Sequence, residues 1–120
     1  MIRCELLDQD IVVVMPEGPL EEADFERLAH AVDPIIAARG KLAGFAVCAP
    51  AFPGWHDFGA FRAHLKFVAH HHRGIERIAV VTDSGLKILA RIAGVFLHPD
   101  IKPFDFAEKD RALAWLQAGG

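Results

Sequence analysis

Two strand-like runs rich in apolar residues constrain the fold of this chain more than any other feature. They are LAGFAVCA at 42–49 and IERIAVVTD at 75–83. Strands that are apolar on both sides are typical of a parallel sheet covered on both faces. The segment between the two runs, 57–73, carries apolar residues at helical intervals. A strand, a helix and a second strand in this order predict parallel strands joined by a right-handed crossover.

The remaining segments continue this alternation. Residues 2–7 and 11–16 are rich in β-forming residues and flank a polar DQD turn, which predicts an antiparallel hairpin. Further helices are expected over 20–39, 84–96 and 107–118, and a last strand within 98–106. The order β-β-α-β-α-β-α-β-α predicts one α/β domain over residues 1–120. Its sheet would be mostly parallel, of about five strands, with the helices largely on one face.

Individual residues predict where the helices begin and bend. Pro19 and the acidic Glu21 suit the start of the first helix, and Asp57 is placed to cap the second. Pro34 lies inside the first helical pattern. Because proline lacks an amide proton and clashes with the preceding turn, we expect it to kink or interrupt that helix.

Composition and charge exclude several classes of protein. Hydrophobic residues make up 52% of the 120 residues, which is enough for a buried core. The net charge is −3 and no basic stripe is evident, so nucleic-acid binding is not predicted. No segment approaches the roughly 20 apolar residues of a membrane span. Residues 1–10 contain acidic side chains and lack a signal-peptide core, so we expect a cytoplasmic protein.

The two cysteines, Cys4 and Cys48, both fall in strand-like runs and form no Cys-x-x-Cys pair. We interpret them as reduced, buried thiols rather than as a disulfide or a zinc-binding pair. Gly85 and Gly94 are too far apart for a phosphate-binding glycine loop. The sequence therefore predicts no cofactor.

Several segments resemble the SpoIIAA-like family of small STAS- and Sec14-type domains. They are Gly54-Trp55 followed by Asp57, LKF at 65–67 leading into HHR at 71–73, IERIAVVTD at 75–83, and ALAWL at 112–116. The resemblance covers nearly the whole chain and implies a strand–helix superhelix of the STAS type, with no catalytic machinery. Better-studied STAS relatives are anti-sigma-factor antagonists switched by phosphorylation of a Ser or Thr, and Sec14-type relatives bind lipids.

The segment TDSGL contains the only aliphatic hydroxyls of the chain, Thr82 and Ser84. A phosphoryl group at a helix N-terminus would be stabilised electrostatically. In the antagonists, however, the phosphorylated residue follows the strand after the first long helix, and the same junction here, 48–57, has no Ser, Thr or Tyr. We therefore favour a structural role, in which Asp83 or Ser84 caps the helix, over a phosphorylation switch.

The loop FPGWHDF at 52–58 follows a parallel strand and opens a helix. Open α/β sheets bind ligands at this carboxyl edge. Phe52 and Trp55 would form an apolar wall there, with His56 and Asp57 supplying polar groups. The alternative is that Trp55 packs over the core and Asp57 only caps the helix. The candidate ligand-binding residues are Phe52, Trp55, His56, Asp57, Asp83 and Ser84.

Histidines cluster at 70–72, in the helix that also holds His64. Neighbouring helical residues point about 100° apart, and no pair here has the i, i+3 or i, i+4 spacing that a shared metal ion needs. We therefore predict no metal site. His72 is expected to end the apolar stripe of the helix, and His70 and His71 to be exposed or at an interface.

The preferred functional hypothesis is a non-enzymatic binding or interaction module that self-associates as a homodimer. Sequential right-handed crossovers place the helices largely on one face of the sheet, while the strands are apolar on both sides. The other face therefore needs cover, and a second copy would supply it. A protein partner, with a regulatory role, is the related expectation.

Two other classes of function stay open. A carrier of a small apolar or lipid-like ligand is favoured by the aromatic residues around one loop, Phe52, Trp55, Phe58 and Phe61. An enzyme would use His56, Asp57 and Asp83, which would have to lie within hydrogen-bond reach of one substrate atom. No nucleophile motif accompanies these three residues, so we expect no enzymatic activity.

Overall fold

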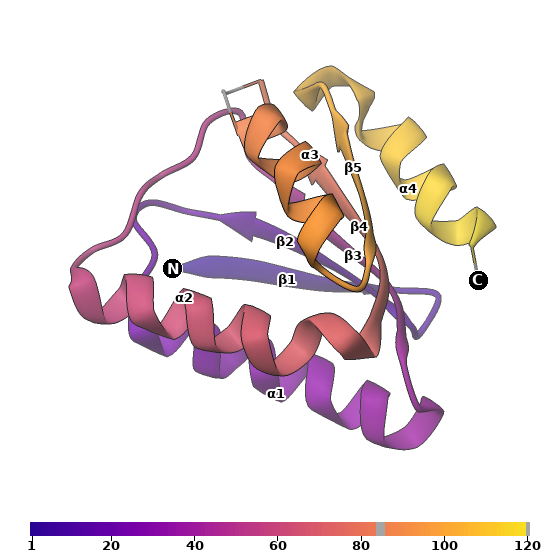
Figure 1. The fold of residues 1–120 in the computed structure, drawn as a ribbon, viewed down its shortest axis with the longest axis horizontal. Helices are drawn as coiled ribbons and strands as arrows, with labels where there is room; N and C mark the ends of the chain where they lie inside the picture. The colour runs from indigo at the N-terminus through magenta and orange to yellow at the C-terminus, as the bar shows by residue number, and fades with distance from the viewer. Residues whose placement is uncertain (84–85, 120) are drawn as a thin grey trace.

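The computed structural model describes residues 1–83 and 86–119, which form a five-stranded sheet with helices on both faces (Figure 1). The strands lie side by side in chain order: β1 (Ile2–Leu7), β2 (Ile11–Pro16), β3 (Leu42–Cys48), β4 (Ile75–Val81) and β5 (Asp100–Phe104). β1 pairs with β2 antiparallel, and every other neighbouring pair is parallel. The helices are α1 (Glu22–Arg39), α2 (Phe58–His71), α3 (Leu86–Phe96) and α4 (Lys109–Ala118), with 3₁₀ turns η1 (His72–Gly74) and η2 (Phe106–Glu108).

This arrangement confirms the predicted α/β fold, its mostly parallel sheet and its N-terminal hairpin. The expected interruption at Pro34 does not occur, because α1 runs without a break from Glu22 to Arg39. Pro34 lies on the exposed side of α1, and so does His30, whose carbonyl loses its partner at the proline. Water can satisfy that carbonyl, while Phe25 and Val32 hold the opposite side of the helix in the core.

The three crossover helices α1, α2 and α3 lie on one face of the sheet, and α4 covers the other. In Figure 1, β4 and β5 separate α3 from α4. Ala112 and Leu116 of α4 are fully buried against β2, β3 and β4. Helices are therefore largely on one face, as predicted. The second face, however, receives its cover from the same chain, so our original reason for expecting a second copy does not hold.

A glycine allows α4 to approach the sheet closely. A Cβ atom on Gly44 would lie 3.1 Å from both Cβ and Cδ2 of Leu116, closer than an unstrained contact. At the edge of the same helix, Nη1 of Arg77 donates to the carbonyl of Trp115 at 2.7 Å. The guanidinium also lies over the Trp115 ring, 4.9 Å from its centroid. These contacts fix α4 on the sheet.

The two thiols differ in their surroundings. Cys48 lies in the central strand β3 and is buried, as expected, whereas Cys4 is exposed, so the predicted burial is wrong for Cys4. The reason is position in the sheet, because β1 is an edge strand and most of its residues face solvent. Both cysteines are free.

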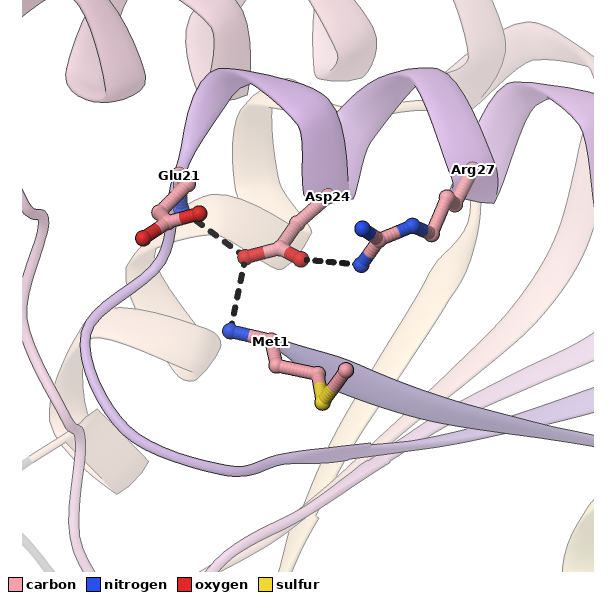
Figure 2. Close-up of polar contacts among 4 residues, drawn as sticks. All are labelled: Met1, Glu21, Asp24 and Arg27. Atoms are coloured by element: carbon pink, nitrogen blue, oxygen red, sulfur yellow. Dashed lines mark hydrogen bonds and ion pairs between the residues drawn. The ribbon is translucent and has the colours of Figure 1, made fainter.

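A fully buried carboxylate, that of Asp24, organises the start of α1 (Figure 2). Its Oδ2 accepts the backbone N–H of Glu21 at 2.8 Å and lies 3.2 Å from the N-terminal ammonium of Met1. Its Oδ1 accepts from Nη1 of Arg27 at 3.1 Å. Figure 2 shows these donors converging on one carboxylate from Met1, which precedes β1, from the residue preceding α1 and from the next turn of the helix.

Candidate functional site

The loop between β3 and α2 is anchored to the segment that precedes α1. The backbone N–H of Leu20 donates to the carbonyl of Gly54 at 2.8 Å, and the N–H of His56 donates to the carbonyl of Leu20 at 2.8 Å. These bonds pair Leu20 with Trp55 as a short parallel bridge. Gly54 has a φ of 83°, a left-handed conformation that glycine adopts without strain. These hydrogen bonds therefore fix the position of the loop relative to the segment that precedes α1.

The aromatic side chains of this loop pack on one another. The Trp55 ring lies 4.8 Å from the Phe52 ring and 4.8 Å from the Phe61 ring, both in edge-on contacts. Trp55 retains 38% exposure, whereas Phe58 is 71% exposed and contacts Phe61 at the edge of the cluster, with ring centroids 6.0 Å apart. The structure thus brings Phe52, Trp55 and Phe61 together, but they fill the space between them. This is the packing role that we gave as the alternative to an apolar wall.

His64 closes the inner side of this cluster. Its Nδ1 accepts a hydrogen bond from the indole Nε1–H of Trp55 at 3.1 Å, so its proton must sit on Nε2. The ring also stacks on Phe25, with centroids 5.0 Å apart. Burial lowers the pKa of His64 from its ordinary value, because the charged form would lose its hydration. His64 is therefore a neutral packing residue, and sequence analysis did not single it out as one.

The two polar residues of the loop border a shallow, open depression of about 360 Å³. His56 and Asp57 line it together with Glu21 and Glu22 of the α1 start. Oδ1 of Asp57 accepts the backbone N–H of Ala60 at 2.9 Å, which confirms Asp57 as the N-cap of α2. The lining is predominantly acidic, so the depression has none of the convergent apolar character of a small-molecule pocket.

Asp83 lies at the other end of the loop. Its Oδ1 accepts the backbone N–H of Phe106 at 2.9 Å, and its own N–H donates to the carbonyl of Pro50 at 3.1 Å. Thr82 is buried and its hydroxyl donates to the same carbonyl at 3.4 Å. Asp83 thus ties β4 to the chain that follows β5. Ser84, the other candidate here, lies outside the described residues.

His56, Asp57 and Asp83 do not share a polar contact in the part of the chain that the structure describes. Figure 1 shows the start of α2 at the opposite end of the loop from the carboxyl end of β4. Each aspartate instead accepts a hydrogen bond from a backbone N–H. Within residues 1–83 and 86–119, no group of three His, Cys, Asp or Glu side chains is placed to hold a metal ion.

The histidine cluster is divided between different environments. His71 is partly buried and stacks on Phe67 with ring centroids 4.1 Å apart. Its Nε2 lies 2.8 Å from Oδ1 of Asp33, so it joins α2 to α1 within the molecule. His70 is exposed, as expected, and Nδ1 of His72 accepts the backbone N–H of His98 at 3.1 Å.

The largest group of exposed apolar side chains lies on α3, away from this loop. Ile88, Ile92, Val95 and Phe96 are 67%, 51%, 79% and 78% exposed. Their i, i+4, i+7 and i+8 spacing places them on one side of the helix. The opposite side holds the buried Ala90 and Gly94, where a Cβ atom would lie 3.7 Å from Ile101 of β5. We call these four exposed residues the outward face of α3.

The fold and its surfaces define a small α/β domain, and comparison with known proteins identifies its class. The SpoIIAA-like family model matches residues 11–117, so the chain belongs to the SpoIIAA-like family. An uncharacterized protein from the DUF3478 family with a SpoIIAA-like fold, from Shewanella loihica PV-4, is a structural neighbour with a TM-score of 0.77. The match covers 97% of this chain and 92% of that chain at 22% sequence identity, which establishes a shared fold. No curated protein matches the chain. No helix among the described residues is both long enough and apolar enough to cross a bilayer.

Proposed function

We propose that this protein is a non-enzymatic interaction module whose contact surface is the outward face of α3, and that it self-associates through that face in solution. The observation that supports the proposal is that α3 is apolar on both sides. A helix on the surface of a soluble domain normally presents polar residues outward. Here the outward side presents four large apolar residues, while small residues face the sheet.

The exposed area of this face is large enough to matter. The four side chains together expose a few hundred Å² of apolar surface, since Phe96 alone would present roughly 150–250 Å² if fully exposed and three aliphatic side chains lie on the same side of the helix. Contiguous apolar patches of about 300–600 Å² are the largest on ordinary monomers and are often functional. Covering this face with another surface would remove the exposed area from water, which favours association.

The other two hypotheses have less support. A ligand carrier would need an apolar cavity at the loop, but Phe52 and Phe61 both pack on Trp55, and the neighbouring depression is polar. An acid–base enzyme would need the carboxylates available to substrate, but Asp57 and Asp83 each accept a backbone N–H. No specific observation favours either function over an interaction surface.

Light scattering coupled to size exclusion, over a range of protein concentrations, tests self-association. We expect the mass to rise from 13.2 kDa toward that of a dimer as concentration increases. Ile92→Glu places a charge on the outward face and should keep the protein monomeric. Leu6→Glu is the matched control, because Leu6 is 58% exposed on the edge strand β1, remote from α3. A wild-type mass of 13.2 kDa at every concentration would overturn self-association.

A further inference from the structure

We propose that the outward face of α3 docks on an anionic lipid surface, with its apolar side chains inserted among the lipids and neighbouring basic residues contacting the headgroups. This inference shares with the proposed function only the contact surface, because it assigns lipid, in place of a second copy, to the outward face of α3. It places the protein on the surface of a bilayer. Two independent features support it: a segregation of charge along the chain, and the combination of bulky apolar and basic side chains on one helix.

Charge is distributed very unevenly in this chain. Residues 58–75, which comprise α2, η1 and the first residue of β4, contain three Lys or Arg and no Asp or Glu. Residues 84–99, which include α3, contain two Lys or Arg and again no acid. All 16 acidic residues lie elsewhere, alongside the other 8 of the 13 basic residues. The net charge of −3 therefore divides into +5 for these two segments and −8 for the rest. An anionic surface would attract α2 and α3 more than the rest of the chain, including α1 on the same face of the sheet, which carries four acidic and two basic residues. This difference would orient the molecule.

The side chains of α3 suit the boundary between lipid headgroups and acyl chains. Val95 and Phe96, at the C-terminal end of α3, are the most exposed of its apolar residues, at 79% and 78%. Arg91 is exposed beside the apolar face, one residue from Ile92. Helices that lie in the membrane interface combine these residue types, because the apolar side chains enter the lipid while the cations bind anionic headgroups. On α2, the exposed Arg62 and Lys66 add to the positive charge that α2 and α3 carry between them.

A second copy would cover the same face less well. A stable protein interface buries about 800 Å² on each partner, more than the few hundred Å² that these four side chains expose. In a two-fold pair of α3 helices, each Arg91 would also approach a helix that carries only basic charges. Self-association through α3 should therefore be weak and should leave the face available to lipid.

Co-flotation with lipid vesicles tests the inference with the full chain. We expect the protein to float with vesicles of phosphatidylglycerol and phosphatidylcholine but not with vesicles of phosphatidylcholine alone. Phe96→Ser should lower the partition coefficient roughly tenfold, because an inserted aromatic side chain is lost. Arg91→Glu should lower it roughly tenfold as well. Leu6→Ser and Arg111→Glu change the same residue types on β1 and α4, away from the outward face, and should leave binding unchanged.

Salt dependence separates this inference from self-association. Added salt should release the protein from anionic vesicles, since it screens the contact between Arg91 and the headgroups. It should not weaken a dimer held by the apolar side chains of α3. The lipid inference is overturned if anionic vesicles fail to bind the protein at low salt, or if Phe96→Ser and Arg91→Glu bind like wild type. An α3-dependent dimer without vesicle binding would leave the proposed function standing and remove only the lipid. Vesicle binding by a protein that stays monomeric would support the lipid inference and contradict self-association.

Discussion

The indole N–H of Trp55 donates a hydrogen bond to Nδ1 of His64 at 3.1 Å, and this bond ties the β3–α2 loop to the second turn of α2. The contact requires a lone pair on Nδ1, so it exists only while the imidazole is neutral with its single proton on Nε2. Burial acts in the same direction, because it lowers the pKa of His64. The loop is thus held by a histidine that folding keeps uncharged.

This arrangement predicts a loss of stability in acid. In the unfolded chain His64 titrates near the ordinary histidine value of about 6.5, and in the folded protein it titrates lower. The unfolded state therefore binds more protons between these two values, and the free energy of unfolding falls as the pH drops through that window. Urea denaturation at a series of pH values should show this slope in wild type. His64→Gln should flatten it.

His56→Gln is the matched control, because His56 belongs to the same loop but is exposed. It should keep the wild-type slope, since its side chain leaves Trp55 and His64 untouched. An unchanged slope in His64→Gln would show that His64 titrates alike in the folded and unfolded states, against the assigned direction of its pKa.

A second prediction concerns the cover that α4 gives the sheet. Leu116 is fully buried and packs directly over Gly44 and Ile11. Leu116→Ala should lower the free energy of unfolding by about 2–5 kcal/mol, because the close-packed site cannot collapse around the smaller side chain. Leu65→Ala is the same change at a position that is 55% exposed, and it should cost less than about 1 kcal/mol. Equal losses in the free energy of unfolding of the two variants would mean that the packing of α4 on the sheet contributes little to stability.

The sheet could be predicted from the sequence because each strand and helix carries its own periodicity. Residues 2–7 and 11–16 match the observed β1 and β2, and the alternation of strands and helices fixed their order in the sheet. The position of α4 could not be obtained this way. No crossover rule governs α4, since it joins no two of the described strands, and its packing depends on the absence of a side chain at Gly44.

The candidate surface was harder to predict than the fold. The pattern of α3 shows that the helix is apolar, but periodicity alone cannot show which of its sides the sheet leaves open. Ala90 and Gly94 face β5, so the bulkier Ile92 and Phe96 face outward. The uneven distribution of charge was not predicted either, because the net charge of −3 does not show that some segments contain no acidic residue. A count of charges by segment would have found them.

The carboxylate of Asp24 gives a third prediction. Its oxygens accept the N–H of Glu21 and bind Arg27, so Asp24→Ala removes the bond that satisfies the start of α1. Arg27 is 54% exposed and can regain water, which limits the penalty. We expect a loss of about 1–2 kcal/mol in the free energy of unfolding, as for other helix-start carboxylates. Glu26→Ala, on the exposed side of the same helix, should change stability by less than about 0.5 kcal/mol.

The last prediction concerns the reactivity of Cys4. Although Cys4 lies on the exposed edge strand, the surrounding protein removes part of the hydration of its thiol and so raises its pKa. The negative charge of Asp24 raises this pKa further, while Arg27 lowers it. A raised pKa leaves less thiolate at neutral pH, and the thiolate is the form that reacts. Iodoacetamide should therefore alkylate Cys4 in the folded protein more slowly than in the protein unfolded by urea. Mass spectrometry of peptides would follow each cysteine.

Asp24→Asn should speed the alkylation of Cys4 in the folded state, because it removes the adjacent negative charge. Cys48, which is buried, should stay unmodified until the protein unfolds. Alkylation of folded Cys4 as fast as in urea would contradict the raised pKa, and an unchanged rate in Asp24→Asn would remove Asp24 as one of its causes.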